Sequence, residues 1–209
     1  VAITLAALVV FLYTAIGGMW ADAVTDLVQG VVLIAGVLVL FGVFIALGGA
    51  EQLAAQPTTR LDPTHGRSTL DALETLAIPI FSTIAAQELA SRALSMRGAR
   101  LAARATVGAG ALYLVLGLLP MMVGLGAGAF IGDDQESEQV LSLFAQQYLP
   151  MPLYVLFLGA LVSAILSTLS GALLVAGSLL AHNVVAPLFP RVWESGRVRL
   201  DRAAVVLFG

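Results

Sequence analysis

Long runs of apolar residues, separated by short polar stretches, dominate the chain. A helix that crosses a bilayer needs about 20 mostly apolar residues. The pattern predicts six helical spans, at residues 1–15, 26–49, 70–94, 105–131, 151–188 and 203–209. The first and last runs are shorter than a bilayer requires. We therefore interpret 1–209 as one transmembrane domain, a fragment whose two outer helices are incomplete.

Composition indicates that lipid is the solvent of these helices. Hydrophobic residues make up 59% of the chain and charged residues 11%, with a mean hydropathy of +0.98. A soluble domain carries about 25% charged residues, so this chain could not cover a water-exposed surface. We expect an all-α, polytopic transmembrane bundle in the cell (inner) membrane, with the lipid bilayer as its partner. The net charge of -3 gives no reason to expect a nucleic-acid partner.

The arginines indicate which loops of the predicted bundle lie on the cytoplasmic side of the membrane. Four lie at residues 92–104, from the end of the third span to the start of the fourth, and four lie between the fifth and sixth. An acidic run, Asp133–Glu138, separates the fourth span from the fifth. Basic loops stay in the cytoplasm. The alternation therefore places both arginine-rich loops inside and the acidic loop outside, and we read these arginines as topology anchors.

The first polar feature follows the opening span. Gly17 and Gly18 allow a backbone turn that a side chain would obstruct. Thr25 or Asp22 could cap the next helix, which would place Asp26 in its first turn. Alternatively, Asp26 and Gln29 line a cytoplasmic exit for a cation, because an acid inside a span is costly unless it faces water or a partner.

The second feature is the interrupted span 70–94. Pro79 removes a backbone donor and obstructs the preceding helical turn. A span broken near Pro79, with Ser82, Thr83 and Gln87 close by, is typical of a transporter's substrate-binding site. A simple proline kink, satisfied by neighbouring helices, is the alternative.

The third feature is a set of hydroxyls in the span 151–188. Ala164, Ser167 and Thr168 stand at i, i+3 and i+4, so they share one helix face. Two hydroxyl oxygens and the Ala164 carbonyl could converge on a hard cation, because such cations prefer oxygen ligands. Alternatively, the hydroxyls bond back to the carbonyls of Ser163 and Ala164.

These motifs together resemble the sodium:solute symporter family. Tyr13 and the Gly17-Gly18 turn, followed by Thr25-Asp26-Leu27-Val28-Gln29, are similar to that family's fifth core helix. The stretch 160–170 resembles its eighth core helix, and 87–97 resembles a diverged form of its sixth. The resemblance implies a five-plus-five inverted-repeat bundle of which this chain covers core helices four to nine. It assigns the sodium site to Ala164, Ser167 and Thr168.

The resemblance also implies a function. We expect sodium-coupled symport of a small organic solute, with sodium as the bound ion and no enzymatic activity. Sugar-type members carry Asn-Gln-Tyr where this chain has Ala86-Gln87-Glu88, which favours an amino acid or a carboxylate as the solute. The alternative is a transporter-like sensor domain of a membrane signalling kinase. The sequence of the complete protein would discriminate between the two.

Overall fold

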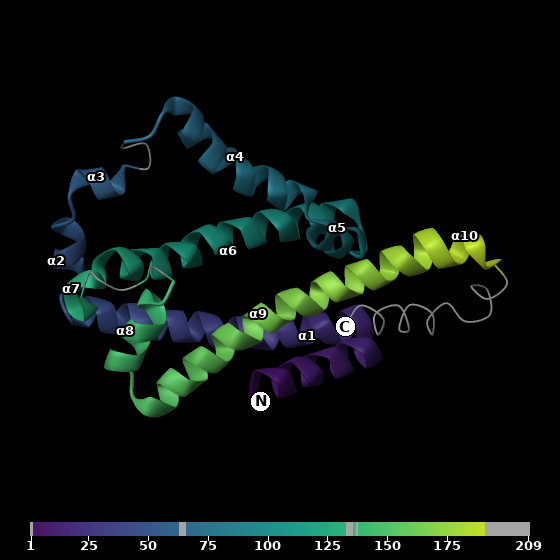
Figure 1. Cartoon of the computed structure of the whole chain (residues 1–209), viewed down its shortest axis with the longest axis horizontal. Coiled ribbons are helices and arrows are strands. Elements are labelled where there is room, and N and C mark those ends of the chain that lie inside the picture. Colours follow the sequence, from purple (N-terminus) through teal and green to yellow (C-terminus); the bar gives the residue numbers. More distant parts are fainter. Residues whose placement is uncertain (1, 63–65, 133–135, 137, 191–209) are drawn as a thin grey trace. The chain divides into compact units, whose positions relative to one another are not determined.

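The computed structural model describes residues 2–62, 66–132, 136 and 138–190. Every regular element in these ranges is helical (Figure 1), which confirms the all-α class. Four elements have 17 residues or more: α1 (Ala2–Ala46), α4 (Thr69–Ala85), α6 (Ala99–Gly126) and α9 (Met151–Leu180). The shorter ones are α2 (Gly49–Ala54), α3 (Thr58–Leu61), α5 (Gln87–Leu94), α7 (Gly128–Ile131), α8 (Val140–Tyr148), a π-helical turn (Ala181–Val185) and α10 (Ala186–Leu188).

Three stretches of the described chain are long and apolar enough to cross a membrane. They are Ile16–Ala46, Ala99–Gly126 and Met151–Leu188, and they overlap the predicted spans 26–49, 105–131 and 151–188. The predicted span 70–94 is divided between α4 and α5, and residues 2–15 form the first part of α1. The predicted span 203–209 lies outside the described residues.

The chain divides into two compact units. The first combines Val1–Leu33 with Gly159–Gly209, and the second is Ile34–Leu158. The long helices α1 and α9 therefore contribute to both units. The candidate ion site belongs to the first unit, and the interrupted span 70–94 to the second.

The second unit is built around Phe44, whose side chain is 0% exposed. The ring centroids of Phe130 and Phe144 each lie 5.9 Å from that of Phe44, edge to face. Gly49 and Gly126 allow this packing, because a β-carbon at either position would lie within 2.6 Å of the Phe44 ring. The aromatic cluster thus ties α1 to α2, α6, α7 and α8.

Candidate functional site

A sharp turn at Gly18 interrupts α1 before the acidic residues. Gly18 has φ 59° and ψ −153°, a backbone conformation that is strained for any residue with a side chain. A β-carbon on Gly17 would lie 2.3 Å from that of Ala21. Both positions therefore require glycine, as the sequence indicates.

The helix resumes directly after Gly18, so Asp22 and Thr25 lie inside it and do not cap it. This corrects the capping alternative. The Thr25 hydroxyl lies 2.9 Å from the carbonyl oxygens of both Ala21 and Asp22 and donates back to its own helix. Asp26 accordingly lies about two helical turns beyond Gly18 rather than in a first turn.

Asp22 and Asp26 face two serines of α9. The hydroxyl of Ser170 forms a hydrogen bond with the carboxyl group of Asp22, and the hydroxyl of Ser167 donates to that of Asp26. The two contacts run in antiparallel register, since moving one turn along α1 moves one turn back along α9. We call these four residues the aspartate–serine seam.

The seam joins two predictions that the sequence leaves separate. Asp26 is the candidate for the ion exit, and Ser167 is a candidate ion ligand. Ala164, the other ligand candidate on this face, lies one turn before Thr168. Carboxylate, hydroxyl and carbonyl oxygens are the ligand types that hard cations prefer. Among the described residues, no group of three or more His, Cys, Asp or Glu is placed to hold a metal ion.

Thr168 and Ser167 behave differently. The Thr168 hydroxyl donates to the Ala164 carbonyl at 3.2 Å, which is the back-bonded alternative. The Ser167 hydroxyl instead points across to Asp26. Thr168 is also exposed, whereas Ser167 is half-buried. Ser167 therefore has the stronger structural case as an ion ligand.

Two further polar groups of this unit are the side chains of Ser170 and Gln29. The sequence analysis placed Gln29 at the ion exit but did not single out Ser170. Ser170 is 0% exposed, yet the sequence analysis gave it no role. A match in spacing could have pointed to Ser170. The serines at 163, 167 and 170 repeat the i, i+4, i+7 spacing of the polar residues at 22, 26 and 29. The Oε1 atom of Gln29 is buried and has no hydrogen-bond partner among the described residues.

The candidate substrate residues lie on α4 and α5. The hydroxyls of Ser82 and Thr83 both donate to the Pro79 carbonyl, at 3.1 and 2.7 Å. The helix continues through Pro79 and breaks instead at Ala86, where ψ is 107°. The expected position of the break was therefore wrong by about two turns, and α5 begins at Gln87, whose side chain lies outside the described part.

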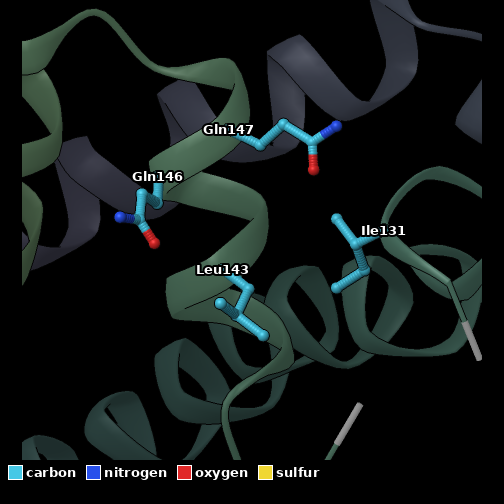
Figure 2. A pocket seen from close by; sticks show the side chains of 4 residues that line it. All are labelled: Ile131, Leu143, Gln146 and Gln147. Carbon is cyan, nitrogen blue, oxygen red and sulfur yellow. The ribbon is translucent and has the colours of Figure 1, made fainter. Parts of the chain in front are cut away.

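A pocket of about 330 Å³ opens in the second unit (Figure 2). Ile131 at the end of α7 and three residues of α8, namely Leu143, Gln146 and Gln147, line it. Both glutamines are exposed. None of the described residues that line this pocket is one that the sequence analysis nominated.

Comparison with known proteins decides the family. The model of the sodium:solute symporter family matches residues 1–208. The chain belongs to the sodium:solute symporter family. This membership confirms the resemblance carried by the Gly17-Gly18 turn and the hydroxyl-bearing helix, and it makes the chain part of a multi-pass membrane protein from a family of transporters.

Two curated relatives of this symporter segment extend the comparison. A sodium/pantothenate symporter of Haemophilus influenzae is 30% identical over 193 residues, which cover 88% of this chain and 40% of the relative. Sodium/proline symporter 2 of Staphylococcus saprophyticus is 32% identical over 186 residues, 85% of this chain and 36% of the relative. The chain thus spans about two fifths of these relatives' length. No solved structure gives a significant match.

Proposed function

We propose that the complete protein couples the uptake of a small organic solute to the entry of sodium. The contact between Asp26 and Ser167 carries the proposal, because it brings a carboxylate to the helix face that bears Ala164 and Thr168. The carboxylate supplies the negative charge that a sodium ion needs inside a span, and the hydroxyls and the carbonyl supply neutral oxygens. Asp26 then receives the ion as it leaves toward the cytoplasm, past Gln29.

We propose that the solute binds near the break between α4 and α5. The first N–H groups of a helix have no acceptor within that helix, and the N-terminus of a half-helix attracts negative charge. The break at Ala86 places the start of α5 at Gln87, close in sequence to Ser82 and Thr83. A solute carboxylate suits such a site. The relatives named for proline and pantothenate both act on carboxylates.

Uptake into liposomes tests this function. The purified complete protein should accumulate at least one solute from a panel of amino acids and small carboxylates, proline and pantothenate included, when sodium forms the inward gradient. Replacing sodium by potassium should abolish that accumulation. Accumulation that is the same with either ion, or absent for the whole panel, would contradict the proposal.

Thr168→Ala separates an ion ligand from a back-bonded hydroxyl. If the Thr168 oxygen contacts sodium, its loss removes a contact worth about 0.5–1.5 kcal/mol, which corresponds to a roughly 2- to 12-fold rise in the sodium concentration for half-maximal uptake. Thr75→Ala is the matched control, because the Thr75 hydroxyl also donates to a carbonyl four residues back, at 2.7 Å, in a helix of the other unit. If both variants and the wild type show equal sodium dependence of uptake, Thr168 is not a ligand of the ion.

A further inference from the structure

Asp22 and Ser170 form the fully buried contact of the aspartate–serine seam, and the proposed sodium site does not use it. Asp22 is 2% exposed and Ser170 is 0% exposed. The neighbouring contact joins Asp26 and Ser167, which are both half-buried. A buried hydrogen bond is costly to break, because water cannot replace the lost partner. The seam therefore combines one closed contact with one that is partly exposed.

The Ser170 hydroxyl links Asp22 to the backbone that carries Ser167. Its oxygen contacts the Asp22 carboxyl group on α1 and lies 2.8 Å from the Ser167 carbonyl oxygen on its own helix. The side chain of Ser167 in turn donates to Asp26. A single residue of α9 thus connects the closed contact to the contact of the ion site.

Helix geometry transmits the position of one contact to the other. Asp22 and Asp26 are four residues apart on α1, and Ser167 and Ser170 are three apart on α9, so each pair lies on one helix face. A helix rises about 1.5 Å per residue, so a slip of one residue between α1 and α9 would displace the Asp26 carboxyl group by about that distance. Fixing Asp22 against Ser170 therefore fixes where that carboxyl group lies relative to Ser167.

Apolar packing does not supply this register by itself. The buried apolar residues of α9 in this unit include Ala160 and Leu166. Their attraction to a neighbouring helix is non-directional. Lipid tails are equally apolar, so helices in a membrane depend on close packing and on interhelical hydrogen bonds for specific association. The hydrogen bond between Asp22 and Ser170 is a directional contact of this kind.

We propose that Asp22 and Ser170 are positioning residues for the sodium site: their buried hydrogen bond holds the register in which the Asp26 carboxyl group meets the Ser167 hydroxyl. Neither residue needs to touch the ion. This role rests on the proposed function, because it requires sodium to bind at Asp26 and Ser167. With the hydrogen bond intact, the oxygens of the ion site are arranged before sodium arrives, and ion binding does not have to supply the energy of arranging them.

Sodium binding to the purified complete protein tests this role in Ser170→Ala. The variant should bind radiolabelled sodium roughly 2- to 12-fold more weakly, because restoring the register can cost no more than about one hydrogen bond. Ser142→Ala is the matched control, since the Ser142 hydroxyl also donates to a carbonyl three residues back at 2.8 Å, but near the start of α8 in the second unit. The control should bind sodium like the wild type. Equal affinity of Ser170→Ala and the wild type overturns the positioning role.

Two further variants separate positioning from a general loss of stability. Ser170→Thr keeps the hydroxyl and should bind sodium more tightly than Ser170→Ala. Adding Ser170→Ala to Ser167→Ala should weaken binding much less than it does in the wild type, because the contact that Ser170 positions is already missing. Independent sites give additive effects instead. Full additivity, or binding by Ser170→Thr that is as weak as that of Ser170→Ala, overturns the proposal.

The same measurements distinguish the positioning role from the ion site itself. If Ser167→Ala and Asp26→Asn weaken sodium binding and Ser170→Ala does not, the ion site stands and the positioning role is wrong. If none of the three variants weakens sodium binding, the proposed function is wrong as well.

Discussion

Asp26→Asn is expected to raise the sodium concentration for half-maximal uptake about 10- to 140-fold, since hydrogen bonds to charged groups are worth about 1.5–3 kcal/mol and each decade of affinity is about 1.4 kcal/mol. Asparagine preserves the size of the side chain and can still accept a hydrogen bond from Ser167. The variant therefore removes the negative charge and little else. Uptake at a series of sodium concentrations in liposomes measures the change.

Glu51→Gln is the control for removing a negative charge elsewhere in the protein. Glu51 is an exposed acid in the first turn of α2, in the other unit, and its neutralisation should leave the sodium dependence of uptake unchanged. A reduced amount of Asp26→Asn protein in the membrane, with normal sodium dependence per molecule, would give Asp26 a purely structural role.

Phe44→Ala should lower the free energy of unfolding by about 3–5 kcal/mol, the usual cost of truncating a fully buried phenylalanine. The loss is large because the ring contacts Phe130 and Phe144 and fills the space left open by Gly49 and Gly126. Unfolding of the purified protein by SDS in mixed micelles measures it. Phe44→Leu keeps much of the volume and should cost less than half as much.

Two glycines of α6 provide a matched check on this cluster. A β-carbon on Gly126 would lie 2.6 Å from the Phe44 ring, whereas one on Gly124 meets no atom within 4 Å. Overpacking a core costs about 1–3 kcal/mol, so Gly126→Ala should destabilise the protein. Gly124→Ala should be neutral or slightly stabilising, because alanine favours a helix interior. Equal effects of the two substitutions would show that the Phe44 packing is not tight.

Long apolar runs are the local signal for helices that are long and apolar enough to cross a membrane. The runs at 26–49, 105–131 and 151–188 each fall on a long helix. The sequence also predicts the Gly18 turn, since two adjacent glycines before a polar stretch mark a backbone that side chains would obstruct. These features are local, and local chemistry is sufficient to identify them.

The contacts of the aspartate–serine seam are not local. Helical periodicity shows that Ser167 and Ala164 share a face, but it does not show which face of α1 meets it. Asp26 and Ser167 are 141 positions apart, and their pairing depends on the register of two helices. Ser170 was overlooked for the same reason, because its importance comes from Asp22.

The helix break illustrates a different limit. Proline disfavours a helix interior, yet α4 continues through Pro79. The hydroxyls of Ser82 and Thr83 donate to the Pro79 carbonyl, so both hydroxyls are satisfied within the helix. The break occurs at Ala86, a residue with no intrinsic tendency to end a helix. Composition alone gives no reason to place it there.

Equilibrium binding of radiolabelled sodium to the purified complete protein tests the central claim most directly, since it requires no knowledge of the solute. Saturable binding is expected in the wild type, with clearly weaker binding in Ser167→Ala and in Asp26→Asn. Ser95→Ala, which removes an exposed hydroxyl donating to the Arg92 carbonyl, should bind sodium like the wild type. Sodium binding of equal affinity in all four proteins would contradict an ion site at Asp26 and Ser167.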